Sequence, residues 1–227
     1  MSNTAIILAA GLGKRMHAGQ NKQFIELLGQ SVLTHTINTF AKISSIDKIV
    51  LVARAGEEEI CQSMIPKNAL AKVIITTGGK ERQDSVYNGI KAISWQCDYI
   101  LVHDGARPLV SEEVILRTLN AAIKTNAAIC AVPVKDTIKQ ADENDNVLAT
   151  IPRHTLWAVQ TPQIFRADLL RQAYDHAYKQ NYYGTDDASL LEYMGERVKI
   201  VMGDYENIKI TTPEDIPTAE QILRKRK

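Results

Sequence analysis

The sequence predicts an α/β protein built on a doubly wound, mostly parallel sheet. Short apolar runs, typical of strands buried on both faces, alternate along the chain with longer amphipathic stretches typical of helices. Several of these runs end in glycines or charged residues, and in such sheets the strand ends form the ligand-binding edge. The predicted strands cover residues 4–8, 46–53, 73–76, 99–102, 127–132, 157–160, 198–201 and 208–210.

Helices are predicted between these strands from local signals. The Ser31 hydroxyl can cap a helix that runs to Phe40 and carries an apolar stripe at helical spacing. Thr161-Pro162 should end the strand 157–160, and Pro213 should begin the last helix. The other predicted helices cover residues 56–64, the segment after the glycine pair 78–79, residues 111–126 and 167–179, and the segment that starts at 185–187.

Length and composition limit the classes of protein that fit. The 227 residues suffice for one large α/β domain and no stretch marks a linker, so we expect a single domain over residues 1–227. A net charge of +1 argues against nucleic acids and membrane surfaces as partners. No apolar run approaches the ~20 residues that span a bilayer, and the amino terminus lacks the parts of a signal peptide. The scattered cysteines fit a reducing cytoplasm: Cys61, Cys97 and Cys130.

The stretch from Thr4 to Lys22 carries the strongest functional signal. Small residues and glycines follow its apolar run, so the backbone can bend and expose its N–H groups: Ala9, Ala10, Gly11 and Gly13. Three cations come next: Lys14, Arg15 and Lys22. A strand end with bare amides beside fixed positive charges is typical of a polyphosphate site.

Two familiar phosphate loops do not fit this stretch. A P-loop would carry Ser or Thr after Gly13-Lys14, where this chain has Arg15. A dinucleotide fingerprint would need a small residue at Met16 and an acid at the end of the second strand, where Arg54 stands. A glycine-rich turn with solvated charges remains the alternative, since short glycine motifs arise by chance.

Gly78-Gly79 forms a second strand-to-helix turn that should open on the same edge. Taken alone, it is equally well a tight turn and a helix start. Together with the first loop it predicts a nucleobase pocket, in which bare glycine backbone hydrogen-bonds a base edge and Ser85 adds a hydroxyl. Such rigid readout can distinguish cytosine from uracil, because the two bases exchange a donor for an acceptor.

A third signal lies where the strand 99–102 ends. Asp104 there suits a Mg²⁺ ion that bridges phosphate oxygens, because magnesium favours one or two carboxylates together with phosphates. Arg107 offers a planar fork for a phosphate. The alternative is a structural salt bridge between Asp104 and Arg107, in a turn that Pro108 ends.

Residues 133–155 depart from the alternation of strands and helices. Their middle is polar and turn-forming, and strand-like segments flank it, which predicts a β-hairpin. A two-stranded excursion is marginal unless it packs on something. Farther on, Thr185 can cap a helix and contact a substrate, while the acids after it suit the helix dipole. Lys209 lies between apolar residues of a predicted strand, so its ammonium must find an anion, for which a phosphate is a candidate.

These segments together resemble a known enzyme class. The order Ala-Ala-Gly-x-Gly-x-Arg-Met followed by Lys-Gln, present at 9–16 and 22–23, resembles the signature loop of the sugar-nucleotide pyrophosphorylases. The motif Val-His-Asp-Gly-Ala-Arg-Pro at 102–108 narrows the resemblance to the 2-C-methyl-D-erythritol 4-phosphate cytidylyltransferases. Further blocks are similar to that family along essentially the whole chain: 132–139, 160–165, 185–189 and 207–211.

The resemblance implies a Rossmann-like nucleotidyltransferase fold and transfer of a cytidylyl group from CTP to 2-C-methyl-D-erythritol 4-phosphate, in non-mevalonate isoprenoid biosynthesis. It also implies a divalent cation such as Mg²⁺, held by Asp104, and a homodimer formed through an arm at about 133–155. Arg153 on that arm would reach the partner's substrate site. The implied catalytic residues are Arg15 and Lys22. The implied nucleotide-binding residues are Ala9, Ala10, Gly11, Gly13, Gly79, Ser85, Asp104 and Gly105. The implied substrate-binding residues are Arg107, Thr137, Arg153, Thr161, Thr185 and Lys209.

Three other functions stay open at this point. A ribitol 5-phosphate cytidylyltransferase would use the same loops on another polyol. A non-catalytic nucleotide-binding module belongs to a different class, and the joint presence of Arg15, Lys22 and Asp104 speaks against it. The failed dinucleotide fingerprint disfavours a nicotinamide dehydrogenase. Lys80 departs from the family, because some relatives carry an acid there; base preference is unaffected if this residue binds through its backbone.

Overall fold

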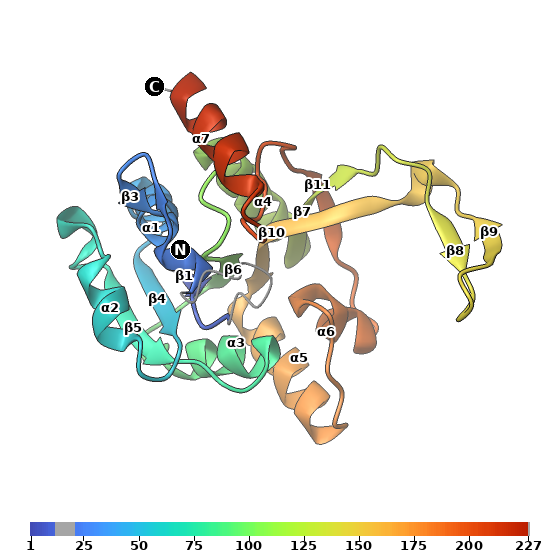
Figure 1. Ribbon diagram of the computed structural model, residues 1–227. Helices are drawn as coiled ribbons and strands as arrows, with labels where there is room; N and C mark the ends of the chain where they lie inside the picture. The colour runs from blue at the N-terminus through green and yellow to red at the C-terminus, as the bar shows by residue number, and fades with distance from the viewer. Residues whose placement is uncertain (12–20, 227) are drawn as a thin grey trace.

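A computed structural model describes residues 1–11 and 21–226, and its centre is a seven-stranded sheet (Figure 1). In spatial order the strands are β11 (Lys199–Met202), β7 (Ala127–Pro133), β10 (Trp157–Arg166), β6 (Tyr99–Asp104), β1 (Asn3–Leu8), β4 (Lys48–Ala53) and β5 (Val73–Thr77). β10 is antiparallel to both of its neighbours, and the other pairings are parallel. The predicted mostly parallel α/β sheet is therefore confirmed.

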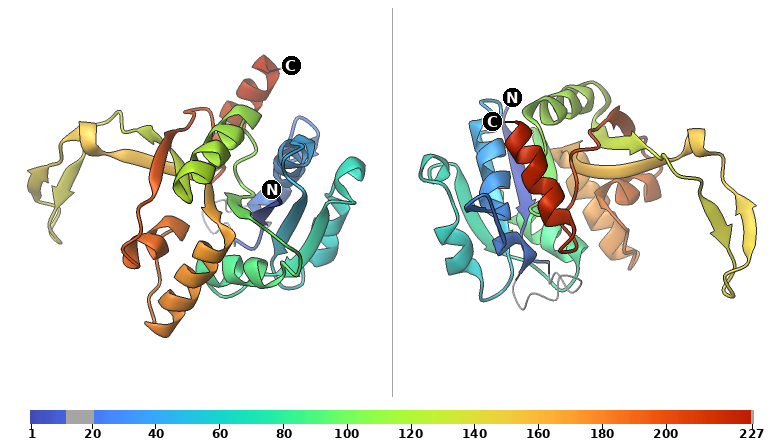
Figure 2. Two further views of the ribbon diagram at one scale, coloured as in Figure 1. Left: turned by 180° about the vertical axis from the view of Figure 1, so that it is seen from behind. Right: turned by 45° about the horizontal axis from the view of Figure 1, so that its top comes forward.

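Helices cover both faces of the sheet, as a doubly wound fold requires (Figures 1 and 2). One face carries α1 (Val32–Lys42), α2 (Glu58–Ser63) and α4 (Glu112–Thr125), and the other carries α3 (Arg82–Lys91), α5 (Ala167–Lys179) and α6 (Asp187–Tyr193). Strand β1 contributes to both cores, because successive side chains point to opposite faces. Ala5 and Ile7 enter one core, and Ile6 and Leu8 enter the other. This is why its sequence is apolar rather than alternating.

Capping side chains begin the helices where the sequence predicts. The Ser31 hydroxyl accepts the N–H of Thr34 at the start of α1, and the Ser111 hydroxyl accepts that of Val114 at the start of α4. α4 ends at Asn126, whose φ of 67° is the left-handed conformation that stops a helix. The predicted stripe of α1 is buried: Val32, Leu33, Thr36, Ile37 and Phe40.

Strand β10 continues to Arg166, so the prediction that it stops at Thr161-Pro162 is wrong. Its pairing with β7 is interrupted between Val159 and Gln163 and then resumes. A proline in a strand is tolerated at such an irregularity, since no ladder hydrogen bond is required of its nitrogen. The two parts of the strand therefore belong to one element, which runs from the base of the hairpin into the middle of the sheet.

The predicted strand 208–210 is also wrong, because these residues form a loop. The N–H of Ile210 donates to the carbonyl of Ala106, which ties this loop to the turn after β6. The last helix, α7 (Asp215–Lys225), begins two residues after Pro213, since the Asp215 carboxylate accepts the N–H groups of the preceding turn. α7 packs near the small hairpin of β2 (Glu26–Leu27) and β3 (Gln30–Ser31) through a separate apolar cluster.

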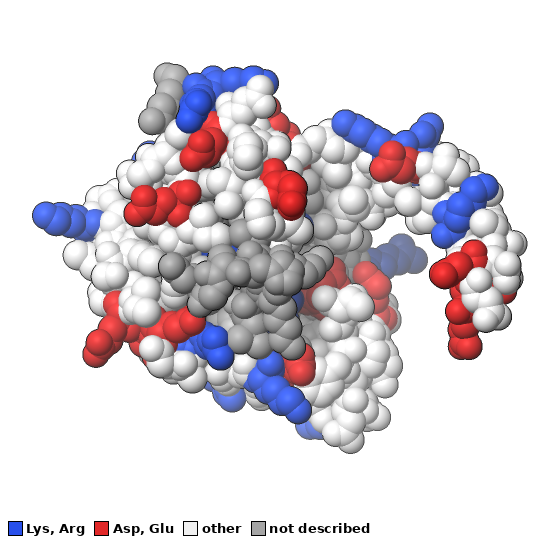
Figure 3. Space-filling model, in the orientation of Figure 1, with Lys and Arg blue, Asp and Glu red and all other residues white. Residues whose placement is uncertain are grey.

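The predicted hairpin is present as an arm, residues 133–155, that projects from the body (Figures 1 and 2). It is formed by antiparallel β8 (Lys139–Ala141) and β9 (Val147–Thr150). Figure 3 shows acidic side chains at its tip and basic ones nearer the body. Val147 and Leu148 are 62% and 61% exposed, so the arm presents apolar surface to its surroundings. In the described part of the chain, no helix has the length and apolar character needed to cross a membrane.

Candidate active site

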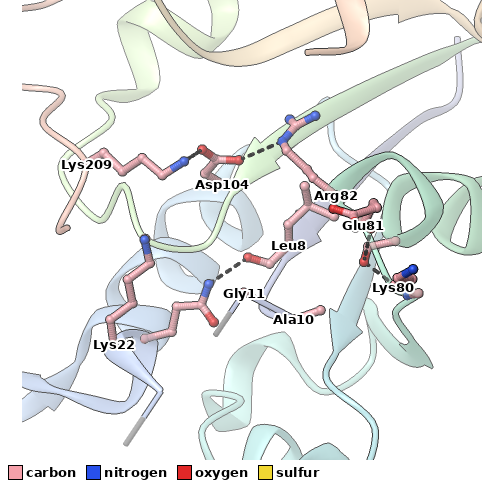
Figure 4. Close-up of a pocket in the computed structure, with 13 residues that line it drawn as sticks. Leu8, Ala10, Gly11, Lys22, Lys80, Glu81, Arg82, Asp104 and Lys209 are labelled. Carbon is pink, nitrogen blue, oxygen red and sulfur yellow. Dashed lines mark hydrogen bonds and ion pairs between the residues drawn. The ribbon is translucent and has the colours of Figure 1, made fainter. Parts of the chain in front are cut away.

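The carboxyl ends of parallel strands meet at one edge of the sheet, as predicted. Leu8, the last residue of β1, pairs with Val52 of β4 and with Asp104 of β6. A cavity of about 270 Å³, the first cavity, opens at this edge (Figure 4). Several predicted nucleotide-binding and catalytic residues line it together: Ala10, Gly11, Lys22, Gly79, Ser85 and Asp104.

The loop after β1 is supported from below by buried hydrogen bonds. Ala9 is fully buried; its N–H donates to the carbonyl of Val52, and its carbonyl accepts the side-chain amide of Asn21 at 3.0 Å. Ala9 thus supports the loop, while Ala10 and Gly11 line the cavity. The predicted Gly13 and Arg15 lie outside the described residues.

Lys22 reaches the first cavity from a short 3₁₀ turn (Lys22–Phe24). Asn21 caps this turn by accepting the N–H of Gln23, and the Gln23 side chain donates to the carbonyl of Leu8 at 3.1 Å (Figure 4). The turn is therefore fastened to the end of β1. Figure 4 shows the Lys22 side chain directed toward the same space as Asp104 and Lys209.

The loop of Gly78 and Gly79, which follows β5, is held by hydrogen bonds within the protein, one of them to Ser85. Gly78 donates its N–H to the carbonyl of Ala53, and Gly79 donates its N–H to the Ser85 hydroxyl at 3.1 Å. The predicted bare backbone at these glycines does not include their N–H groups, because both donors are already used within the protein. A Cβ at Gly79 would lie 2.3 Å from that of Asp84, so the loop can close only with glycine there.

Asp104 lies between two cations at the end of β6 (Figure 4). Its Oδ1 is 3.5 Å from Nε of Arg82, and its Oδ2 is 2.5 Å from Nζ of Lys209. Burial alone would raise the pKa of Asp104, but the charges of Arg82 and Lys209 outweigh it and hold that pKa well below its usual range. The carboxylate is therefore ionised at neutral pH, and it is the anion that Lys209 finds in this structure.

The alternative salt bridge between Asp104 and Arg107 is wrong. Arg107 instead donates from Nη1 to the carbonyl of Asn207 at 2.7 Å. Its Nε is buried and has no hydrogen-bond partner among the residues that the structure describes. A buried donor without an acceptor is rare in folded proteins. It is expected for a guanidinium that binds an anionic ligand through this donor.

His103 and Thr161 fasten β6 to β10 beside Asp104. The Thr161 hydroxyl accepts the N–H of Asp104 at 3.0 Å and lies 3.0 Å from Nδ1 of His103, while Nε2 of His103 lies 3.2 Å from the carbonyl of Arg107. Since a carbonyl only accepts, Nε2 carries the proton and Nδ1 accepts from the hydroxyl. Burial lowers the pKa of His103 to about 4, so this imidazole is neutral near pH 7 and serves as a brace.

A second cavity of about 340 Å³ adjoins the first. Three residues line both cavities: Arg82, Asp104 and Lys209. Four of the predicted substrate-binding residues line the second cavity together: Arg107, Thr161, Thr185 and Lys209. Thr185 is not the helix cap, because the Asp186 carboxylate accepts the N–H of Ser189 at the start of α6. The loop after β1 and the four predicted substrate-binding residues thus lie on either side of the ion pairs of Asp104 with Arg82 and Lys209.

The two predicted arm residues do not join either cavity of the same protomer. Thr137 and Arg153 are exposed, and Arg153 donates from Nη1 to the carbonyl of Lys135 at 2.6 Å. Gly105 likewise lines neither cavity. Its N–H donates to Leu8 and its carbonyl accepts the Thr36 hydroxyl, so it packs the turn beneath Asp104.

Arg82 lines both cavities, although the sequence predicted no role for it. It is the first residue of α3, where the helix dipole disfavours a positive charge. An arginine at such a position indicates acidic partners nearby, and that signal was present in the sequence. The structure supplies two such partners, Asp104 and Asp187.

The donor set at Asp104 can be compared with what Mg²⁺ requires. The described residues hold no group of three or more acidic, histidine or cysteine side chains arranged for a metal. Mg²⁺ bound with a nucleotide needs only one or two carboxylates, because phosphate oxygens and water complete its octahedral shell. A single ionised carboxylate at the edge of the first cavity therefore fits a metal that arrives with a triphosphate.

Gly105→Ala should lower the free energy of unfolding by about 1–3 kcal/mol, the usual cost of overpacking. An added Cβ would lie 2.7 Å from the carbonyl oxygen of Leu8, a backbone atom that cannot move without shifting the end of β1. Urea denaturation followed by circular dichroism measures the change. An unfolding free energy equal to that of the unmodified chain would contradict the close packing of these two strand ends.

Comparison with known proteins agrees with this geometry. The family model described as 2-C-methyl-D-erythritol 4-phosphate cytidylyltransferase matches residues 3–225. The enzyme of that name from Alkaliphilus oremlandii is 49% identical over 226 residues, which are 99% of this chain and 96% of the relative. The one from Geobacillus kaustophilus is 49% identical over 227 residues, 100% of this chain and 99% of the relative.

Solved structures give the same result at the level of the fold. The crystal structure of 4-diphosphocytidyl-2C-methyl-D-erythritol synthase from Anaerococcus prevotii superposes with a TM-score of 0.86 at 37% identity and covers 98% of each chain. That of 2-C-methyl-D-erythritol 4-phosphate cytidylyltransferase from Thermus thermophilus has a TM-score of 0.80 at 31% identity, covering 97% of this chain and 98% of the other. The sequence, the sheet and the site agree: the chain belongs to the 2-C-methyl-D-erythritol 4-phosphate cytidylyltransferase family.

Proposed function

We propose that this enzyme joins CTP and 2-C-methyl-D-erythritol 4-phosphate to give 4-diphosphocytidyl-2-C-methyl-D-erythritol and pyrophosphate, a step in isoprenoid precursor biosynthesis. The family supports this activity. The structural observation that carries it is the pair of cavities that meet at Asp104. One cavity has a phosphate-type loop for a nucleotide, and the other has cations and hydroxyls for a second phosphate.

The reaction is an in-line displacement at the α-phosphorus of CTP. An oxygen of the polyol phosphate forms the new bond to that phosphorus, and the bond between the phosphorus and the β-bridging oxygen breaks. The electron pair of the broken bond leaves with pyrophosphate. The attacking phosphate is already ionised at neutral pH, so no general base is needed, and catalysis rests on alignment and on neutralisation of charge.

Each group of residues then has a role in that displacement. Lys22 and Arg15 stabilise charge on the α-phosphoryl group and on the departing pyrophosphate. Lys209 and Arg107 hold the polyol phosphate in the second cavity, with Thr161 and Thr185 beside it. Asp104 would hold Mg²⁺, which supplies charge neutralisation for the triphosphate when bound.

We also propose that the enzyme works as a homodimer in the cytoplasm, without nucleic-acid or membrane partners. The exposed apolar residues Val147 and Leu148 favour contact of the arm with a second subunit. Thr137 and Arg153 lie on the same arm, so an arm that crosses to a partner would carry both toward the partner's substrate cavity. The three cysteines are free, as in a reducing compartment.

Arg153→Ala should chiefly raise the KM for the polyol phosphate, by about 10- to 100-fold, because one charge-assisted phosphate contact contributes about 1.5–3 kcal/mol. The KM for CTP should change little. Steady-state kinetics with each substrate varied in turn measures the two constants. An effect confined to the KM for CTP would contradict the proposed role of the arm.

Release of pyrophosphate in a coupled assay tests the activity itself. The assay compares the four nucleoside triphosphates against 2-C-methyl-D-erythritol 4-phosphate and ribitol 5-phosphate, with and without Mg²⁺. We expect turnover with CTP, the methylerythritol phosphate and the metal together. Faster turnover with ribitol 5-phosphate would replace the proposed substrate, and no release with any pair would contradict the activity.

A further inference from the structure

Arg82 lines both cavities and has no role in the mechanism proposed above. We propose that Arg82 is a further catalytic residue: its guanidinium contacts the phosphate oxygens that meet between the cavities, and buried Asp187 and Tyr174 position it. This inference rests on the proposed function, because it concerns the same site.

Arg82 occupies the place where the two substrates must approach each other. It lines the first cavity, in which the nucleotide loop lies, and it lines the second cavity beside Thr161 and Thr185. Figure 4 shows Arg82 and Lys209 on opposite sides of Asp104. An α-phosphate in one cavity and an attacking phosphate in the other would therefore meet within reach of Arg82.

The contacts of the guanidinium leave part of it available to a ligand. Nη2 donates to Oδ2 of Asp187 at 2.8 Å, and Nε lies 3.5 Å from Oδ1 of Asp104. Nη1 makes no hydrogen bond to any residue that the structure describes, and the side chain is 32% exposed. A guanidinium has five N–H donors in a rigid fork, so Nη1 and the second proton of Nη2 can receive phosphate oxygens.

The other side of Arg82 is anchored in the core. Asp187, the first residue of α6, is 0% exposed, and the hydroxyl of Tyr174 donates to its Oδ1 at 2.6 Å. A buried carboxylate is costly without an ionic partner, and Arg82 is that partner. Asp187 and Tyr174 therefore act as positioning residues. They hold Nη2 of Arg82 from the core side and leave Nη1 available to a ligand in the cavities.

A fixed cation at this position would stabilise the transition state of the proposed displacement. Two anionic phosphates must come within bonding distance, and the transition state spreads negative charge over the equatorial oxygens of the α-phosphoryl group. Lys209 can offset this charge from one side as a point charge. Arg82 offers a planar fork from the other side, and because Asp187 holds it in place it needs no reorganisation during the reaction.

Two variants of Arg82 test the proposal. Arg82→Gln should lower kcat by about 100-fold or more, the usual loss for one transition-state donor, while the affinity for CTP measured by calorimetry changes far less. Arg82→Lys should restore less than about one tenth of kcat, because an ammonium lacks the fork. A change confined to the KM for CTP would overturn the proposal.

Arg82→Gln also leaves Asp187 buried without its ionic partner, so a structural effect must be separated from a catalytic one. The double variant Arg82→Gln/Asp187→Asn removes both charges and keeps an amide pair in their place. If its melting temperature returns toward that of the unmodified enzyme while kcat stays low, Arg82 acts on the substrate. If kcat returns to within about threefold, Arg82 merely neutralises Asp187 and the proposal is overturned.

Two further variants complete the experiment. Tyr174→Phe keeps both charges and removes only the hydrogen bond to Asp187; it should lower kcat by less than about tenfold with both KM values unchanged. Arg171→Gln is the matched control, because Arg171 donates to the backbone carbonyls of Ile90 and Ile93 away from both cavities, and its kcat should be unchanged. Failure of the unmodified enzyme to release pyrophosphate would contradict the proposed function, whereas normal turnover by the Arg82 variants would contradict this inference alone.

Discussion

Alanine at Lys22 should lower kcat by about 100- to 1,000-fold while the fold persists, because loss of one preorganised transition-state donor costs about 3–4 kcal/mol. The short turn that carries Lys22 is fastened by Asn21 and Gln23 through contacts that do not use the lysine side chain. The substitution should therefore leave the turn attached to the end of β1 and remove the positive charge that Lys22 brings to the cavity.

Pyrophosphate release under saturating substrates measures this effect, and thermal unfolding checks the fold. Lys42→Ala is the matched control, because Lys42 is an exposed lysine at the end of α1 that lines neither cavity. Its kcat should equal that of the unmodified enzyme. Near-normal turnover by the Lys22 variant would remove this residue from the mechanism.

Asp104→Asn should reduce kcat by about 100-fold and raise the Mg²⁺ concentration that gives half-maximal activity. An amide has nearly the shape of a carboxylate but no charge, so it weakens a magnesium site and leaves Arg82 and Lys209 without their shared anion. We expect the unfolding free energy to fall by only about 1–2 kcal/mol, because both cations are partly exposed and solvent screens them.

The Asp104 variant is compared with Asp98→Asn at the other end of the same strand. Asp98 accepts the N–H of Ser2 near the amino-terminal edge of the sheet, opposite the cavities, so its replacement should leave both kcat and the Mg²⁺ dependence unchanged. Titrating MgCl₂ at fixed CTP gives the two curves. An unaltered Mg²⁺ dependence in Asp104→Asn would place the metal on other ligands.

The sequence is sufficient to predict an element of the fold wherever a single local pattern determines that element. Apolar β1, the capped helix α1 and the hairpin at 133–155 have periodicity or turn chemistry that few alternatives satisfy, and all three are confirmed. The gathering of Arg107, Thr161, Thr185 and Lys209 in one cavity follows from the resemblance to the family, since these residues are far apart along the chain.

The sequence-based predictions are wrong or incomplete where contacts between residues far apart in the chain determine the structure. Residues 208–210 have strand-like composition, yet no described strand pairs with them. Ile208 and Ile210 pack instead in the apolar cluster beside α7, and the loop places Lys209 next to Asp104. A proline normally ends a strand, but β10 pairs with β7 before and after the interruption, and with β6 from Gln163 onward. The role of Arg82 depends on Asp187, more than one hundred positions away, which no local pattern connects to it.

The path of β10 limits how the arm can be altered to test the proposed dimer. One continuous strand leads from the arm past Thr161 to the antiparallel pairing with β6. Excising residues 133–155 as though they were a surface insertion would disturb the return of this strand beside Asp104. Polar substitutions at Val147 and Leu148 change only exposed side chains, so they are the better way to test the proposed assembly separately from turnover.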